Sequence, residues 1–353
     1  MKILHTSDIH IDSPLTARLP SAKIRERRRE LISNFSDLVS EARKNGCAAV
    51  IIAGDLFDSE TVSKKAKTIV LDTILTSRDL TFFYLKGNHE GDALTEDTKI
   101  PKNLCIFGDE WSYFEAPGLT VAGRSVCNDK MFSELNLPAD SKNIVVLHGE
   151  LRDRSSGEAV GKLDAVGKNI DYMALGHYHS YSAEKIDSRG VAVYSGTPEG
   201  RGFDEAFDCG YVILDTDTME HRFVPFAKRR LRIVKLPLNG MVSPSEISEA
   251  AEHLLKDIPS RDLIRLELTG EYAPELWRDT EALERKFAER FYHFEVKDSS
   301  KIRIDPESYK YDKSFKGEFI RTVSADETLD DDKKAKIIAC GLYALMGENI
   351  FDN

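Results

Sequence analysis

Seven residues of types that bind metal ions occur in five short polar motifs. They are Asp8 and His10 in HTSDIH, Asp55 in AGDLFD, Asn88 in KGNHE, His148 in LHGE, and His177 and His179 in GHYHS. A carboxylate carries two usable oxygen atoms, whereas a neutral imidazole or an amide offers one ligand atom, so Asp55 is suited to bridge two ions. We predict one ion bound by Asp8, His10, Asp55 and His179, and a second bound by Asp55, Asn88, His148 and His177.

The charge of this ligand set suits hydrolysis of a phosphate ester. Two divalent ions and two aspartates leave roughly +2 to attract an anion or a hydroxide, and metals about 3.5 to 4 Å apart can activate a water that bridges them. Nitrogen and oxygen ligands without thiolates fit manganese, iron or zinc. His89 follows Asn88 directly. It is therefore the candidate to stabilise developing charge or to protonate the leaving oxygen, with Glu90 or Asp92 as a residue that could orient its imidazole.

Each motif follows a short apolar run that predicts a buried strand. The runs AAVIIAG, LTFFYLK, NIVVLHG and DYMALGH lead into motifs, and a helical stripe of apolar residues ends at Asn45-Gly46. This alternation predicts an α/β fold over residues 1–226, with the motifs at the carboxyl ends of strands, where ligands bind in open α/β sheets. Side chains alternate along a strand, so the two residues of DIH, and those of HYH, would point to one side if the backbone stays extended.

The pattern changes in the second half of the chain. Four strand-like runs, VAVYSG, CGYVILD, HRFVPF and LRIVKLPL, predict a second sheet packed on the first. A turn signal then separates a domain of residues 1–238 from a small α/β cap of residues 239–305, in the order helix, strand, helix, strand. We expect residues 306–353 to form an extended linker, up to residue 324, and a terminal amphipathic helix. The apolar face of that helix carries Ile338, Leu342, Leu345 and Met346.

Composition restricts the class of protein. With 353 residues, 41% of them hydrophobic, the chain can form one large core and a smaller second domain. A formal charge of -11 opposes non-specific wrapping of nucleic acid. Basic clusters occur at residues 23–29, 228–235 and 310–316. Each could form part of a local basic track for nucleic acid, or could be a solvated face. Without a membrane-spanning run or a signal peptide, and with five scattered cysteines that we expect to be reduced, a cytoplasmic protein with no membrane partner is predicted.

The five motifs together resemble the calcineurin-like metallophosphoesterase superfamily over residues 1–226. HTSDIHIDSPL, AGDLFDS, KGNHE, GHYHS and YSGTPEGRGFDE are further similar to SbcD-type DNA double-strand-break repair nucleases, especially their YhaO-like bacterial branch. The resemblance implies a two-sheet αββα sandwich with a small cap and a C-terminal tail. It also implies two Mn²⁺ ions on the seven residues above, His89 as the catalytic histidine, and exonuclease or endonuclease activity on DNA.

The resemblance implies partners as well. Such nucleases usually form homodimers through the nuclease domain and bind an SbcC-type ATPase with a long coiled coil. The tail helix around residues 338–346 is the candidate for that docking, and a helix folded back on its own domain is the open alternative.

Two residues depart from the family pattern, and a third has an open role. Asp58 stands where archaeal and eukaryotic members carry a second catalytic histidine, and Glu90 stands where an aspartate is common. Arg201, in the loop after TPEG, could reach a substrate phosphate, although an exposed arginine is the simpler interpretation.

Three functions remain open at this point. A metal-dependent DNA nuclease subunit is favoured by the intact ligand set and by the cap and tail. A small-molecule phosphodiesterase or phosphatase would share the same core, but such enzymes often stop near the end of the second sheet. A non-catalytic scaffold on this fold would be expected to have lost ligands, whereas all seven are present together with His89.

Overall fold

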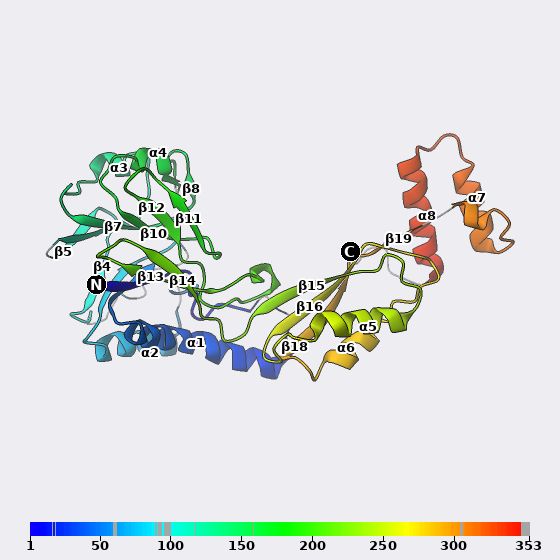
Figure 1. Ribbon diagram of the computed structural model, residues 1–353, viewed down its shortest axis with the longest axis horizontal. Helices are drawn as coiled ribbons and strands as arrows, with labels where there is room; N and C mark the ends of the chain where they lie inside the picture. Colours follow the sequence, from blue (N-terminus) through cyan, green and yellow to red (C-terminus); the bar gives the residue numbers. More distant parts are fainter. Residues whose placement is uncertain are drawn as a thin grey trace. The chain divides into compact units, whose positions relative to one another are not determined.

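The computed structural model describes residues 1–353 except for residues 16, 18, 59–61, 89, 91–93, 95–99, 117, 158, 304–305 and 347–353. For residues 306, 331, 332 and 346 it describes the backbone alone. The chain forms two compact units, Met1–Leu231 and Arg232–Asn353 (Figure 1). The predicted three-part division at residues 238 and 305 stays a prediction.

The first unit contains two six-stranded sheets, and each has a parallel centre. The first sheet has the order β14-β13-β1-β2-β3-β4. Four of its strands are parallel: β1 (Lys2–Thr6), β2 (Cys47–Ala53), β3 (Thr81–Leu85) and β4 (Leu104–Ile106). Two further strands pair antiparallel beside β1: β13 (Gly210–Asp215) and β14 (His221–Pro225). The second sheet has the order β11-β12-β10-β7-β6-β5. Its four central strands are parallel: β6 (Leu119–Gly123), β7 (Lys142–His148), β10 (Tyr172–Gly176) and β12 (Val191–Tyr194). The two edge strands are antiparallel: β5 (Ser112–Ala116) and β11 (Ser182–Lys185). A short pair, β8 (Leu151–Arg152) and β9 (Val160–Gly161), lies outside them.

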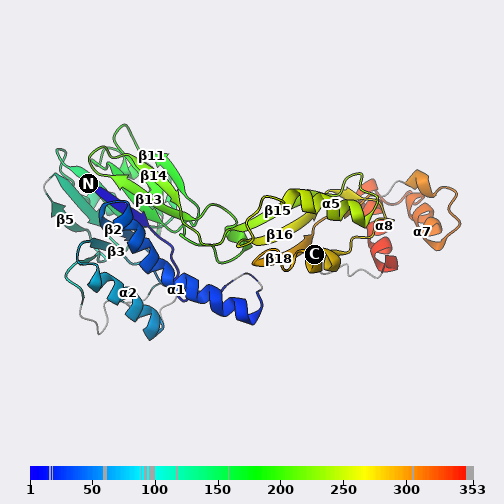
Figure 2. The same cartoon turned by 60° about the horizontal axis from the view of Figure 1, so that its bottom comes forward.

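The sheets pack face to face because their central strands are apolar on both sides. In β2, Ile51 contributes to the core between the sheets, whereas Val50 and Ile52 contribute to the core beneath the helices. That outer core includes residues of α1 (Ser21–Lys44) and α2 (Lys64–Thr76), and short helices α3 (Met131–Glu134) and α4 (Lys162–Ala165) cover the second sheet (Figures 1 and 2). The predicted αββα sandwich is confirmed.

The four runs expected to form the second sheet belong to three different sheets. VAVY becomes β12 of the second sheet, but GYVILD and HRFVP become β13 and β14 at the edge of the first. LRIVKLP becomes β15 (Leu231–Pro237) in the three-stranded sheet β15-β16-β18. The prediction was wrong because apolar alternation identifies a strand without identifying its neighbour. Here β13 pairs with β1 across more than two hundred residues, for example Ile3 with Leu214.

The second unit has the element order expected for the cap. Its helices are α5 (Pro244–Leu255) and α6 (Thr280–Phe287), and its strands include β16 (Leu263–Thr269) and β18 (His293–Asp298), which pair in parallel. The short strands β17 (Glu271–Tyr272) and β19 (Lys301–Ile302) form a separate pair. Ser243 caps α5 by accepting a hydrogen bond from the N–H of Glu246, as the Ser-initiated helix predicted. In the part of the chain that the structure describes, no helix is long and apolar enough to cross a membrane.

Residues 306–324 are not the extended linker that we expected. They form the 3₁₀ helix η2 (Pro306–Tyr309) and helix α7 (Phe315–Ser324), which Ser314 caps. The single buried turn around Ile320 is hidden among charged residues, so no helical period was evident. The terminal helix α8 (Asp331–Met346) buries Ile338 and Leu342 in a small core with Ile320 and η2. This face of α8 therefore packs on its own unit.

Candidate metal centre

The seven predicted ligands lie at the carboxyl ends of central strands from both sheets. Asp8 and His10 follow β1, Asp55 follows β2, Asn88 follows β3, His148 ends β7, and His177 and His179 follow β10. Ligand atoms of Asp8, His10 and His179 lie within 4.8 Å of one another, and so do those of Asp8, Asp55 and His148. The two sheets thus jointly form one polar cluster.

The paired ligands reach this cluster through left-handed backbone. The φ angles are 50° at Asp8, 48° at His10 and 107° at His177. The expectation of an extended backbone was wrong, because β1 ends at Thr6 and β10 at Gly176, before the motifs begin. Such conformations cost about 1 to 3 kcal/mol each and persist where surrounding contacts fix them. One such contact joins the sheets, since the backbone N–H of His177 donates to the Asp8 carboxylate at 3.0 and 3.1 Å.

Two glycines permit the strands to approach closely. Gly54 has a φ of +90°, and a Cβ there would lie 2.1 Å from Nδ1 of His148. A Cβ at Gly176 would lie 1.9 Å from the carbonyl oxygen of Ala53. Any larger residue at either position would displace groups beside the candidate ligands.

Asp8, His10 and His179, together with Asp55, are called the His10 group here. Nε2 of His10 lies 3.2 Å from Nε2 of His179. Nδ1 of His10 lies 2.8 Å from Asp58 Oδ1, and Nδ1 of His179 lies 2.7 Å from Glu205 Oε1. An ionised carboxylate only accepts hydrogen bonds, so Nδ1 of His179 carries the proton and its Nε2 presents a lone pair. The two Nε2 atoms therefore face each other beside the carboxylates of Asp8 and Asp55, an arrangement that fits a divalent metal ion.

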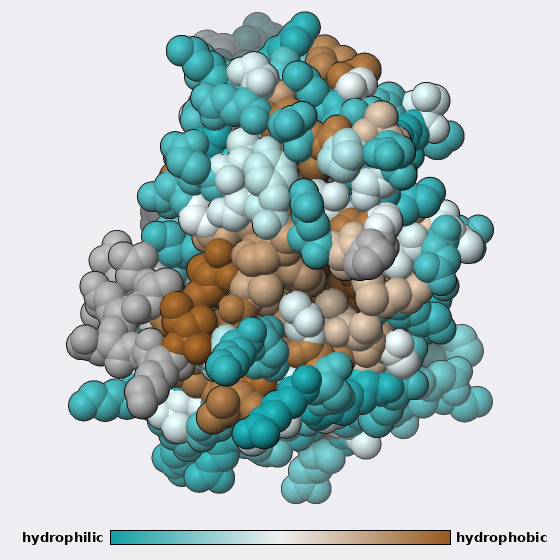
Figure 3. All heavy atoms as spheres, turned by 90° about the vertical axis from the view of Figure 1, so that its left-hand side faces the viewer, coloured by the Kyte–Doolittle hydropathy of each residue, from teal (hydrophilic) through white to brown (hydrophobic). Residues whose placement is uncertain are grey.

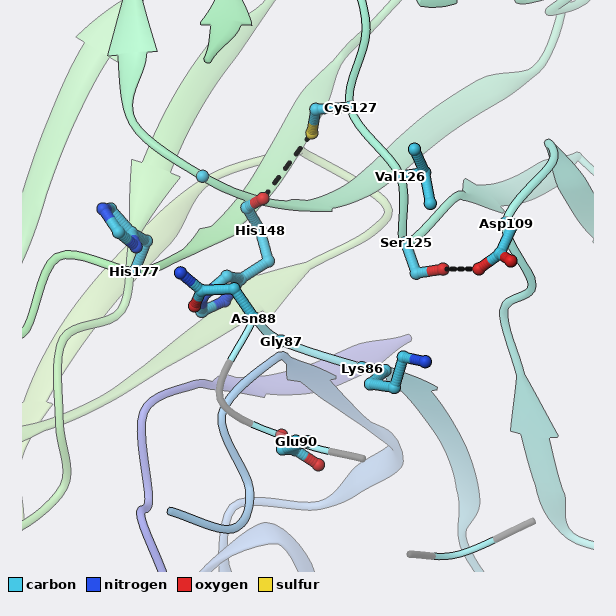
Figure 4. Close-up of a pocket in the computed structure, with 11 residues that line it drawn as sticks. Lys86, Gly87, Asn88, Glu90, Asp109, Ser125, Val126, Cys127, His148 and His177 are labelled. Carbon is cyan, nitrogen blue, oxygen red and sulfur yellow. Dashed lines mark hydrogen bonds between the residues drawn. The ribbon is translucent and has the colours of Figure 1, made fainter. Parts of the chain in front are cut away.

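Asn88, His148 and His177, together with Asp55, are called the His148 group. His148 Nδ1 donates to the carbonyl oxygen of Ala53 at 2.9 Å, while its Nε2 lies 3.2 Å from Asn88 Oδ1. Oδ2 of Asp55 lies 3.5 Å from Nε2 of His148 and 3.6 Å from Nε2 of His10, so this carboxylate stands between the two groups. Figure 4 shows Asn88 beside His148, with the His177 ring nearby.

The electrostatic environment favours a cation at the His148 group. Burial lowers the pKa of His148, but its hydrogen bond to Asp55 and the charges of Asp8 and Asp55 raise that pKa to about 9. Burial, followed by the charge of His148, lowers the pKa of His177. The carboxylates therefore stabilise one positive charge at this end of the site, where a metal ion would take the place of the proton.

Arg201 lies inside the structure beside these ligands. Its side chain is 14% exposed and donates to Asp58 Oδ1 at 3.2 Å, to Glu205 Oε1 at 2.9 Å and to Ser13 Oγ at 3.0 Å. The interpretation of Arg201 as an exposed arginine was wrong, because the loop after β12 turns this side chain inwards onto two carboxylates. Burial raises the pKa of Glu205, but hydrogen bonds from His179 and Arg201 hold it at about 2. Glu205 is therefore ionised.

Glu90 contacts the segment just after Asp55 and the strand β3. Its carboxylate accepts hydrogen bonds from the backbone N–H of Leu56 and from the hydroxyl of Tyr84. Burial raises the pKa of Glu90 to about 8. The catalytic candidate His89 lies outside the described residues, and so does Asp92. The role of His89, and its orientation by Glu90 or Asp92, therefore stay predictions.

Sequence reasoning did not single out two residues that contact the ligands. Glu205, in η1 (Phe203–Glu205), holds His179, and Ser7 donates to the carboxylate of Asp8. One feature of the sequence could have identified Glu205: it ends the motif YSGTPEGRGFDE, four residues after Arg201. Ser7 carried no signal beyond its place next to Asp8.

A pocket of about 400 Å³ opens beside the His148 group. Asn88, His148 and His177 line one side, and the loop with Ser125 to Cys127 lines the other. Lys86 also lines it, and in Figure 4 its side chain extends away from His148 towards Ser125 and Asp109. The pocket is therefore large enough for a small organic group attached to a phosphate.

Two of the basic clusters are partly used inside the fold. Arg27 is buried and pairs with Glu30 and Glu199, and Arg229 pairs with Glu26 and Glu30. Arg229 thus joins the segment before β15 to α1, and Arg27 joins α1 to the loop after β12. Their charges are therefore largely neutralised locally, which favours the structural interpretation for these residues.

Comparison with known proteins identifies the family. The sequence profile of the calcineurin-like phosphoesterase family matches residues 1–181. The chain is 25% identical to the DNA double-strand break repair protein Mre11 of Methanosarcina acetivorans, over 76% of this chain and 46% of that protein. It is 24% identical to the uncharacterized metallophosphoesterase YhaO of Bacillus subtilis, over 61% of this chain and 57% of that protein. It is 22% identical to the SbcD subunit of the nuclease SbcCD of Staphylococcus epidermidis, over 67% of this chain and 72% of that protein.

The chain spans about half the length of the first two relatives. The profile covers just over half of the chain and all seven predicted ligands. The chain belongs to the calcineurin-like phosphoesterase family.

Proposed function

We propose that this chain is a DNA nuclease subunit that hydrolyses phosphodiester bonds with two divalent ions, Mn²⁺ being the expected metal. The observation that carries the proposal is the position of the Asp55 carboxylate, with one oxygen 3.5 Å from His148 Nε2 and 3.6 Å from His10 Nε2. The names of two relatives, the repair protein Mre11 and the nuclease SbcCD, support DNA as the substrate.

Each group of ligands has a separate task in this proposal. The His10 group would hold one ion, the His148 group the other, and Asp55 both. Bound ions would supply Lewis acidity and a water of lowered pKa. His89 would protonate the leaving oxygen. Lys86 would place a positive charge at the far side of the pocket, near Ser125 and Asp109.

Cleavage of end-labelled linear duplex, hairpin and single-stranded DNA tests the proposal across divalent metals. We expect cleavage with Mn²⁺ that stops with chelator, and a loss of about 100-fold or more in His89→Ala, the scale of one proton-transferring group. Asp164→Asn, on α4 outside the site, is the control and should retain full activity. Binding of Mn²⁺ without cleavage of any DNA, even with a coiled-coil ATPase present, would reject it.

A second candidate is hydrolysis of small phosphodiesters, and the pocket beside the His148 group favours it. A volume of about 400 Å³ suits a small organic phosphoester. Bis-p-nitrophenyl phosphate in the same assay separates the candidates. Rapid turnover of this compound without DNA cleavage would support the second.

We also propose that the α7–α8 pair binds a coiled-coil ATPase. Ile338 and Leu342 are buried within the unit, but Tyr311 and Phe315 are exposed. Aromatic side chains of this kind are common anchors in protein interfaces. Phe315→Ser with Tyr311→Ser should weaken co-purification with the ATPase and leave the melting temperature unchanged. Trp277, which is also exposed, provides the control substitution, Trp277→Ser. Undiminished co-purification of the double variant would contradict the assignment.

A homodimer is proposed through the first unit. Leu75 and Ile100 are exposed along a groove that Leu71 and Pro101 also line. Figure 3 views this unit from the side of β4 and β5 and shows apolar surface between hydrophilic rims. A second copy of the chain would bury this surface. Leu75→Asp should therefore shift sedimentation from dimer to monomer, and an unchanged dimer would exclude this groove as the interface.

A further inference from the structure

We infer that Asp58, Arg201 and Glu205 form a positioning unit that fixes the two imidazoles of the His10 group for metal binding. The inference rests on the proposed two-metal site. These residues act through His10 and His179, so they are positioning residues rather than catalytic ones.

The contacts form a continuous chain from one imidazole to the other. Asp58 Oδ1 lies 2.8 Å from Nδ1 of His10 and 3.2 Å from Nη1 of Arg201. Glu205 Oε1 accepts a hydrogen bond from Nη2 of the same guanidinium at 2.9 Å and another from Nδ1 of His179 at 2.7 Å. Arg201 therefore determines the positions of both carboxylates, and each carboxylate determines the orientation of one imidazole.

Glu205 is held at both of its oxygens. While Oε1 contacts His179 and the Arg201 side chain, Oε2 accepts the backbone N–H of Arg201 at 2.6 Å. The carboxylate cannot rotate without losing one of these bonds, and it is almost fully buried. The tautomer and the ring orientation of His179 are therefore fixed before a metal binds, which raises affinity because less order must be created on binding.

The second group is held differently. Nδ1 of His148 donates to the main-chain carbonyl of Ala53, and no carboxylate is needed there. Loss of the positioning unit should thus weaken one metal site and spare the other. A general loss of folding would weaken both sites together.

Asp58 gains a specific role from this arrangement. In the resembled family, archaeal and eukaryotic members have a catalytic histidine at this position. Here the side chain contacts His10 and Arg201 and is 24% exposed. We therefore assign Asp58 a role through His10, which it contacts directly.

Titration calorimetry and electron paramagnetic resonance of Mn²⁺ bound to the full chain test the inference without DNA. Wild-type protein should bind two ions. Asp58→Ala and Glu205→Gln should each weaken one of the two sites by about 10- to 100-fold, the usual effect of losing a partner of a metal-bound histidine, and leave the other within about twofold. Asp58→Asn, which keeps an acceptor oxygen but not the charge, should recover part of the affinity.

Asp164→Asn is the matched control. Asp164 is 21% exposed and pairs with Arg154, much as Asp58 is 24% exposed and pairs with Arg201, but it lies on α4. Its Mn²⁺ affinities should equal those of wild type. Thermal unfolding in chelator identifies any variant that does not fold, and Glu205→Gln, which preserves shape, remains informative if Asp58→Ala unfolds.

Unchanged Mn²⁺ affinities in both variants would overturn the inference, and so would equal weakening of both sites. Wild-type protein that binds fewer than two ions would overturn it as well. Because no DNA is present, the outcome is separable from the proposed function. A protein with two Mn²⁺ sites, selective loss in Glu205→Gln and no DNA cleavage would sustain the inference and reject the nuclease.

Discussion

The two ligand groups of the candidate metal centre differ in what holds their imidazoles. In the His10 group, Nδ1 of each histidine faces a side-chain carboxylate, and Arg201 links the two carboxylates. In the His148 group, Nδ1 of His148 donates to the carbonyl oxygen of Ala53, at the end of β2. The first arrangement depends on three side chains, whereas the second depends on strand packing and on Gly54.

This difference predicts which kind of substitution alters metal binding at each group. A carboxylate makes the opposite nitrogen of an imidazole a stronger ligand and can be altered by a single substitution. A main-chain carbonyl is altered only when the backbone moves. We therefore expect side-chain substitutions to act selectively on the His10 group and backbone substitutions to act on the His148 group. The shared residue Asp55 should affect both, and so should Asp8, whose carboxylate lies near His148 as well as His10.

The largest effect is expected for Asp55→Asn. The amide presents one oxygen and no charge, so both groups lose the shared carboxylate. We expect both Mn²⁺ affinities to fall and phosphodiesterase activity to drop by about 100- to 1000-fold, the scale of removing one charge-stabilising group. Calorimetry and a bis-p-nitrophenyl phosphate assay measure the two quantities. Loss of only one bound ion would contradict the assignment of Asp55 to both groups, because Asp55 would then belong to a single group.

Gly54→Ala should have the next largest effect. The new Cβ would lie 2.1 Å from His148 Nδ1, and the φ of +90° adds strain of about 1 to 3 kcal/mol. The His148 group should lose Mn²⁺ affinity more than the His10 group does. Chemical denaturation and Mn²⁺ titration measure both effects. Gly46→Ala is the control, since φ there is +69° but the Cβ would meet no atom within 4 Å, and it should lower stability alone.

Arg201→Lys should have a smaller effect. Lysine keeps the positive charge but cannot contact two carboxylates with a planar fork. Affinity at the His10 group should fall about three- to tenfold, less than the loss on removing a direct partner of a histidine. Mn²⁺ titration measures it. An equal or greater loss at the His148 group would contradict selective action.

The smallest effect on metal binding is expected for Tyr172→Phe. His5 lies on β1 and is fully buried, and its Nδ1 shares a hydrogen bond with the Tyr172 hydroxyl at 2.9 Å. Burial lowers the pKa of His5 to about 3, which is typical of a neutral core histidine. Removing the hydroxyl should cost about 1 to 3 kcal/mol of unfolding free energy, because a buried polar nitrogen loses its partner. Mn²⁺ titration should be unchanged, and altered affinity would assign His5 to the metal centre.

The sequence sufficed for much of this site because chemistry restricts residue types. Few side chains bind divalent ions, and the motifs with Asp8, Asp55 and His148 follow apolar strands, so their convergence could be predicted. Glu205 could not be identified in this way. Its contact with His179 depends on the path of the loop after β12, and the sequence does not encode that path as a local pattern.

The same limit explains the errors in the fold. The strands β13 and β14 were visible as apolar runs, but their place beside β1 depends on long-range pairing. Helix α7 was missed because only a short buried stretch around Ile320 marks it among charged residues. The left-handed conformations at Asp8 and His10 were missed because non-glycine residues rarely adopt them outside functional sites.

One measurement tests the two-group centre most directly: anomalous X-ray diffraction from crystals of the Mn²⁺-loaded protein. The account predicts two manganese peaks. One should lie within bonding distance of His10 and His179, the other within bonding distance of Asn88, His148 and His177, and both should contact the Asp55 carboxylate. A single peak, or two peaks that do not share Asp55, would contradict it.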